Sequence, residues 1–121
     1  MLRSLRGSSF VILLGLGGAW SIPASDNSGA ESTGDRVRGK AQYEQFCLLC
    51  HGLQGLGDGP MAKASTPPAS NLTSREVKSK KDQDLLSIIA DGKGSGMPAW
   101  RGIMTDQGLL DIIAYVRSLG G

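Results

Sequence analysis

Both cysteines and the only histidine of this 121-residue chain fall within five consecutive positions, CLLCH at residues 47–51. Thiolates and imidazoles are protein ligands that soft and transition-metal centres prefer. The remaining 116 residues contain neither side chain. Whatever the chain binds through a thiol or an imidazole, it must bind at this one short segment, and the fold has to be built around it.

Four interpretations compete for this segment. A disulfide between Cys47 and Cys50 would suit an exported protein, but it would leave His51 without a role. A thioredoxin-like redox pair requires a strand-and-helix context that the surrounding pattern lacks. A structural zinc site requires about four ligands, whereas the chain has only three Cys and His side chains. The C-x-x-C-H spacing itself is a specific signature of covalent haem attachment.

Physical arguments favour haem attachment. Residues three apart lie on the same side of a helical turn, so the thiols of Cys47 and Cys50 could both reach vinyl groups on one edge of a porphyrin. His51 follows directly and could place an imidazole nitrogen on the iron. A large apolar cofactor would also enlarge a small core, since only 5% of the residues are aromatic. We predict one covalently attached haem c, with the disulfide as the alternative.

Residues 1–24 have the three parts of an export signal: two arginines, an uncharged apolar run and a zone of small residues. Cleavage is expected after Ser21, with a site near Ser25 as the alternative. The apolar run covers residues 10–20, whereas a membrane-spanning helix needs about 20 residues. A cleaved signal is therefore favoured over a retained N-terminal anchor that tethers the protein to a membrane. We expect an exported protein, soluble or tethered, in the bacterial periplasm.

Removal of the signal peptide would balance the charge of the chain. The full sequence has 13 Lys and Arg against 11 Asp and Glu, and the loss of Arg3 and Arg6 would leave 11 of each. Nucleic-acid binding needs a basic face, so no nucleic-acid partner is expected. The basic segment at residues 75–81 is predicted to be a solvated loop that leads into a helix, with a docking patch as the alternative.

The rest of the chain divides into a leader and one domain. Residues 25–34 are rich in small and polar side chains without periodicity, which predicts a flexible leader. A single domain is then expected over residues 35–121, with no internal repeat. This domain is small enough that its long loops would be unusual unless they surrounded a cofactor.

Three segments of the domain have apolar side chains at helical spacing. Helices are therefore expected within residues 34–52, 79–92 and 105–121. Ser79 and Asp82 have the spacing of a capping box, and Thr105 or Asp106 could cap the last helix. No segment alternates as a strand would. The sequence predicts an all-α domain whose Gly- and Pro-rich loops wrap around the haem.

Several motifs resemble those of the small monohaem class I cytochromes c. Besides CLLCHG, they are GLGDGP, GKGSGMPAW and LLDIIAYVRSL, and the resemblance covers essentially all of residues 35–121. It implies a cytochrome c-like fold in which the first and last helices cross closely. The matching positions here are Gly39 and Tyr43 on one helix and Ile112 and Tyr115 on the other. A glycine at such a crossing lets two backbones approach each other.

The sixth iron ligand decides what a haem protein does. His51 is the only histidine, so ligation by two histidines of this chain is excluded. Methionine is the remaining soft donor, and the candidates after signal removal are Met61, Met97 and Met104. Met97 is favoured because glycines and a proline in GSGMPAW allow a loop to lie close to the ring. The resemblance assigns this methionine the distal-ligand role as well.

A haem with His and Met ligands favours electron transfer over bond-making chemistry. Methionine raises the reduction potential, and six-coordination leaves no position for a substrate. We expect a single-electron carrier and not an enzyme, a monomer that docks transiently on redox donors and acceptors. The alternatives are a five-coordinate haem protein that binds gases or acts as a weak peroxidase, and an electron-accepting subunit of a dehydrogenase complex. Trp100 is expected to pack on the haem, with a place in a docking surface as the alternative.

Overall fold

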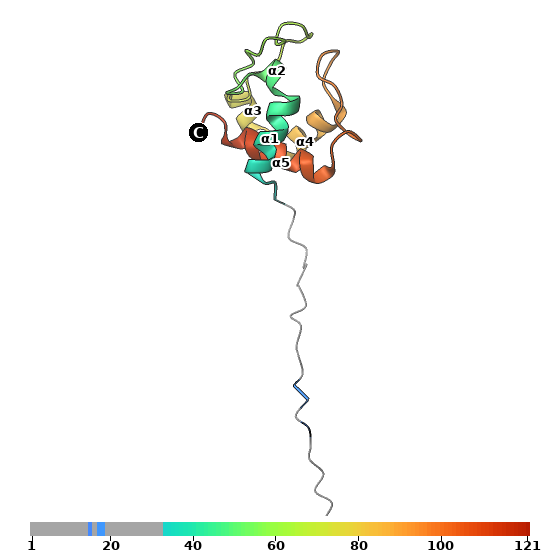
Figure 1. Ribbon diagram of the computed structural model, residues 1–121. Helices are drawn as coiled ribbons and strands as arrows, with labels where there is room; N and C mark the ends of the chain where they lie inside the picture. Colours follow the sequence, from blue (N-terminus) through green and yellow to red (C-terminus); the bar gives the residue numbers. More distant parts are fainter. Residues whose placement is uncertain (1–14, 16, 19–32) are drawn as a thin grey trace, which may run out of the picture.

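All regular secondary structure in the described part of the chain is helical. The computed structural model describes residues 15, 17–18 and 33–121. Its helices are α1 (Arg36–Phe46), α2 (Leu48–His51), α3 (Arg75–Ser79), α4 (Asp82–Asp91) and α5 (Asp106–Ser118) (Figure 1). Within those residues the β pairings are two isolated bridges, Lys93 with Met97 and Arg101 with Met104. The predicted all-α fold is confirmed.

The predicted signal peptide (residues 1–24) and leader (residues 25–34) fall almost wholly outside the described residues, and both stay predictions. Only three glycines of the first and the last two residues of the second are described. In the part of the chain that the structure does describe, no helix combines the length and the apolar character needed to cross a bilayer.

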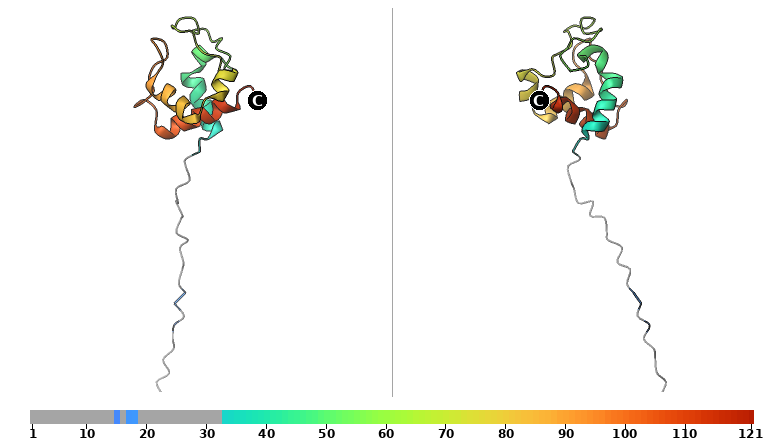
Figure 2. Two further views of the ribbon diagram at one scale, coloured as in Figure 1. Left: turned by 180° about the vertical axis from the view of Figure 1, so that it is seen from behind. Right: turned by 60° about the vertical axis from the view of Figure 1, so that its left-hand side comes forward.

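Helix α1 lies across α5 at very close range (Figures 1 and 2). Gly39 permits this approach, because a Cβ at this position would lie 1.9 Å from the carbonyl oxygen of Asp111. One turn further along α1, the ring centre of Tyr43 lies 5.0 Å from that of Tyr115. Ile112 is only 1% exposed at the same crossing. The predicted crossing, with its glycine, two tyrosines and isoleucine, is confirmed.

The apolar core gathers around α5. Its buried members are Tyr43 from α1, Val77 from α3, Leu85, Ile89 and Ala90 from α4, Leu109, Ile112, Ile113, Tyr115 and Val116 from α5, and Leu119 just beyond it. Full burial of a large apolar side chain stabilises a fold by about 1.5–3 kcal/mol, so α5 supplies the largest share. Cys47, Leu72, Met97 and Trp100 pack against the edge of this core.

The first predicted helix is interrupted at Cys47, which ends α1 and precedes α2. The Cys47 amide donates to the Tyr43 carbonyl at 2.8 Å, and the Cys47 carbonyl accepts from the His51 amide at 2.9 Å. The chain therefore keeps a helical course through the break. Gly52, with φ of +80°, ends α2 as predicted. Thr105 caps α5 as predicted, because its hydroxyl accepts from an amide of the first turn at 3.0 Å.

The basic segment at residues 75–81 is largely helical, so the prediction of a solvated loop was wrong. Its first five residues form α3. The predicted capping box was wrong as well. The Ser79 hydroxyl donates to the Glu76 carbonyl at 3.0 Å, at the end of α3. Lys81 precedes α4, and its side chain makes no capping hydrogen bond.

Lys78 explains why this segment is ordered. Its ammonium group donates to the carbonyl oxygens of Arg117, at 3.2 Å, and Leu119, at the end of α5. Arg117 in turn donates to the Lys78 carbonyl at 3.1 Å, at the end of α3. The last carbonyls of a helix have no partner within the helix, so each basic side chain caps the helix of the other. Because the Lys78 ammonium group is already hydrogen-bonded to the end of α5, it is not available to a docking partner. This weakens the alternative that the segment is a docking patch.

A buried carboxylate ties the start of α1 to α5. Asp111 is 1% exposed and accepts four hydrogen bonds. One comes from the Asp35 amide, two from the Arg38 guanidinium and one from the Gln107 amide. Burial raises the pKa of Asp111, but the hydrogen bonds from Arg38, Asp35 and Gln107 outweigh burial and lower the pKa overall. The carboxylate therefore stays charged at neutral pH.

Asp111→Asn is expected to lower the free energy of unfolding of the haem-loaded protein by about 1–3 kcal/mol at pH 7, because buried hydrogen-bonding groups lose their partners. The folded-state pKa of Asp111 lies below its ordinary value. Its stabilisation is therefore complete above the unfolded pKa of about 3.9 and is lost as the pH falls through the folded value. Urea unfolding at neutral and acidic pH measures this. A difference between the two proteins that is unchanged at acidic pH contradicts the account.

The Gly39→Ala substitution tests the helix crossing, because a close crossing and a distant one predict opposite changes in the free energy of unfolding. Helix propensity alone would stabilise α1 by about 1 kcal/mol. The added methyl group, however, would lie 1.9 Å from the Asp111 carbonyl oxygen, so a net loss of stability is expected. Urea unfolding measures it, with Gln45→Ala at an exposed position of α1 as the control. A Gly39→Ala protein more stable than the wild type would show that the helices do not cross at this distance.

Candidate functional site

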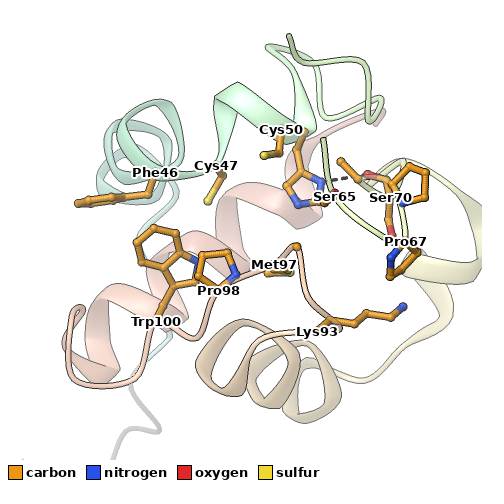
Figure 3. Close-up of a pocket in the computed structure, with 14 residues that line it drawn as sticks. Phe46, Cys47, Cys50, Ser65, Pro67, Ser70, Lys93, Met97, Pro98 and Trp100 are labelled. Carbon is orange, nitrogen blue, oxygen red and sulfur yellow. Dashed lines mark hydrogen bonds between the residues drawn. The ribbon is translucent and has the colours of Figure 1, made fainter. Parts of the chain in front are cut away.

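A large cavity separates α2 from the loop at residues 92–98 (Figure 3). Its two adjoining parts hold about 560 and 690 Å³ of empty space, which includes space open to solvent. Five residues line both parts: Cys47, His51, Ser70, Lys93 and Met97. Cys50 lines the first part. The fold thus brings all four predicted site residues, Cys47, Cys50, His51 and Met97, to one space.

The two cysteines present their sulfur atoms to the cavity from the same wall (Figure 3). Both are free thiols. Burial, and secondarily the neighbouring Cys50, raises the pKa of the Cys47 thiol to about 12. Cys47 therefore remains a protonated thiol at neutral pH. The helical turn from Cys47 to His51 holds both sulfur atoms at the same edge of the cavity.

His51 has one ring nitrogen fixed and the other left available. Its Nδ1 lies 2.9 Å from the carbonyl oxygen of Ser70 (Figure 3, dashed line). A carbonyl only accepts, so Nδ1 carries the proton and Nε2 keeps a free lone pair. Burial lowers the pKa of His51, although the bond to Ser70 opposes this, so the ring is neutral. A neutral imidazole whose second nitrogen bonds to a backbone carbonyl is typical of a metal ligand.

Met97 lies across the cavity from the two cysteines (Figure 3). The loop is held by two backbone hydrogen bonds with Lys93: the Lys93 amide donates to the Met97 carbonyl at 3.0 Å, and the Met97 amide donates back at 3.2 Å. The other two candidates lie elsewhere. Met61 is 49% exposed, Met104 packs against the core, and neither lines the cavity.

The loop that carries Met97 rests on the segment that precedes Ser70. The Ser95 hydroxyl donates to the Thr66 carbonyl at 3.1 Å. A Cβ on Gly96 would lie 1.9 Å from the Cβ of Ser65, so only glycine permits this contact. The wall with the methionine and the segment that holds the histidine are therefore in direct contact at one edge of the cavity.

The residues that line the cavity and that sequence reasoning missed include Phe46, Ser70 and Lys93. The ring centre of Phe46 lies 5.3 Å from that of Trp100, and the two side chains form an aromatic wall of the cavity. This contact agrees with Trp100 as a packing residue. Ser70 contributes through its carbonyl oxygen, which any residue would supply, so no side-chain pattern could have revealed it. Lys93 could have been noticed in the sequence, because it is the nearest basic residue before Met97.

The residues around the cavity suit an apolar group that contains a metal ion. Phe46, Pro67, Pro98 and Trp100 line the first part, and Leu72, Val77, Leu85, Ile88, Ile89, Ile112 and Val116 line the second. An imidazole and a thioether face this space, and two thiols stand at its edge. Among residues 33–121, no group of three His, Cys, Asp or Glu side chains is arranged to hold a metal ion. The donor set fits haem and gives no support to zinc.

Comparison with known proteins identifies the family. The family model described as "Cytochrome C oxidase, cbb3-type, subunit III" matches residues 34–116. The chain is 29% identical over 94 residues to cytochrome c-554(547) of Halothiobacillus neapolitanus, which covers 71% of this chain and 98% of that protein. It is 32% identical over 88 residues to the cbb3-type cytochrome c oxidase subunit FixP of Bradyrhizobium diazoefficiens, which covers 72% of this chain. The chain spans only 28–32% of the length of the oxidase subunits that it matches.

A solved structure shares the fold. Cytochrome c6 from the diatom Phaeodactylum tricornutum is similar with a TM-score of 0.55 and 23% identity, over 70% of this chain and 93% of that chain. The single CxxC haem c-binding motif, at residues 47 and 50, lies inside the range that the family model matches. The chain therefore belongs to the cbb3-type cytochrome c oxidase subunit III family, and its residues 34–116 form a monohaem cytochrome c domain.

Proposed function

We propose that this protein carries single electrons on a haem that Cys47 and Cys50 bind covalently and that His51 and Met97 ligate. The single observation that carries the proposal is the convergence of these four side chains on one cavity from two opposite walls. Of the three candidate methionines, only Met97 lines that cavity.

Cys47 and Cys50 make the attachment. Each free thiol would add its S–H across one vinyl C=C bond, with sulfur on one carbon and hydrogen on the other and no net oxidation. When bound, the haem supplies an iron that gains and loses one electron. His51 donates the Nε2 lone pair while its Nδ1–H stays on the Ser70 carbonyl, which fixes the orientation of the ring. Met97 offers its thioether from the opposite wall, and methionine ligation raises the reduction potential.

The place of action is outside the cytoplasm. Bacterial c-type cytochromes of this family are extracytoplasmic, which supports the periplasm as the location. We propose a free, monomeric carrier. A carrier has to leave each partner again, so we propose small transient contacts with exported or membrane-bound redox proteins. The oxidase subunits among the relatives make a membrane oxidase a candidate partner.

Met97→Ala is expected to abolish the weak long-wavelength absorption band of sulfur bound to ferric iron and to lower the reduction potential, because the stronger remaining ligands favour ferric iron. Optical spectra of the oxidised, haem-loaded protein measure this. Met104→Ala is the matched control, since Met104 packs against the core without lining the cavity. Retention of the band in Met97→Ala, or its loss in Met104→Ala alone, would overturn the assignment.

Carbon monoxide separates the electron carrier from the five-coordinate alternative. The reduced wild-type protein is expected to resist carbon monoxide at neutral pH, because Met97 occupies the sixth position. Reduced Met97→Ala is expected to bind it rapidly. Rapid binding by the wild type would instead favour gas binding or weak peroxidase activity.

A further inference from the structure

We propose that Lys93 binds a carboxylate of the haem and that this ion pair keeps the reduction potential high. The inference rests on the covalent attachment at Cys47 and Cys50 proposed above. It assigns a role to a side chain that belongs neither to the attachment motif nor to the iron ligands.

The backbone places Lys93 beside Met97. The two residues face each other in an antiparallel bridge and exchange both backbone hydrogen bonds, at 3.0 and 3.2 Å. Side chains directly opposite each other in an antiparallel pair lie on the same face. Lys93 and Met97 therefore project to the same side of the loop, and both line the two parts of the cavity.

Lys93 is also the lining cation without a carboxylate partner. The second part of the cavity is apolar except for a few groups, among which Glu76, Lys80 and Lys93 are charged. Lys80 pairs with Glu76 at 3.5 Å. No ion pair involving Lys93 occurs in residues 33–121. A carboxylate that entered this space would find the Lys93 ammonium group free to pair.

The two attachment thiols lie at one edge of the cavity, and this would determine on which side the haem carboxylates lie. Haem has its two vinyl groups on one half of the ring and its two carboxylates on the other half. If Cys47 and Cys50 bind the vinyl half, the carboxylates would lie on the side of the cavity away from the two thiols. Lys93 lies across the cavity from Cys50, on the Met97 side (Figure 3). Its charge offsets a carboxylate that would otherwise stabilise the ferric state, so the pair favours the ferrous state.

Lys93→Gln in the haem-loaded protein tests this role. It is expected to shift the reduction potential to lower values and to shift the haem-carboxylate bending band in the resonance Raman spectrum. Lys93→Arg keeps the charge and is expected to restore both readouts to near wild-type values. Lys81→Gln makes the same change of charge at an exposed lysine that lines neither part of the cavity, and it is expected to change neither.

Equal effects of Lys93→Gln and Lys81→Gln on the potential, or an unshifted carboxylate band in Lys93→Gln, would overturn the proposal. The outcome is distinguishable from a failure of Met97 ligation. A wild-type protein without the sulfur-to-iron band, in which Lys93→Gln still shifts the potential and the carboxylate band, would refute Met97 as the ligand and support Lys93 as the carboxylate site.

Discussion

The close approach of α1 to α5 at Gly39 is the contact on which the site depends. Because no side chain separates the helices, the Gly39 Cα lies against the Asp111 backbone, and α1 acquires a fixed direction. Cys47 follows α1 directly, so that direction sets where the attachment motif begins. The Tyr43 hydroxyl then donates to the Gly52 carbonyl at 2.7 Å, which ties the end of the motif to the same crossing. One wall of the cavity is thereby fixed by the helix crossing.

The opposite wall is held by a different set of bonds. The Trp100 and Arg101 amides donate to the carbonyls of Ile89 and Ala90 at 3.2 and 2.9 Å, which anchors the loop with Met97 to α4. Since both α1 and α4 pack on α5, the positions of both walls depend on α5. The loop is otherwise rich in glycine, and it also contacts the segment before Ser70. Such a construction holds the two proposed iron ligands, His51 and Met97, on different walls, while the polypeptide between them is mostly loop.

The parts of the site that were predictable carry their chemistry in side chains at fixed spacing. CLLCH, the glycine at the crossing and Met97 in its glycine-rich loop are of this kind. The order of α3 was missed because it depends on Lys78 and Arg117, 39 residues apart, each capping the helix of the other. The bond from His51 to Ser70 was missed because the acceptor is a backbone carbonyl. Tertiary contacts and backbone acceptors leave no signature in a single sequence.

X-ray absorption at the iron edge of the purified protein measures the atoms that surround the iron of the proposed haem. One sulfur atom and five nitrogen atoms are expected as iron neighbours, the sulfur from Met97 and one nitrogen from His51. An iron surrounded only by nitrogen or oxygen, or one with five neighbours, would contradict the arrangement of ligands on two opposite walls.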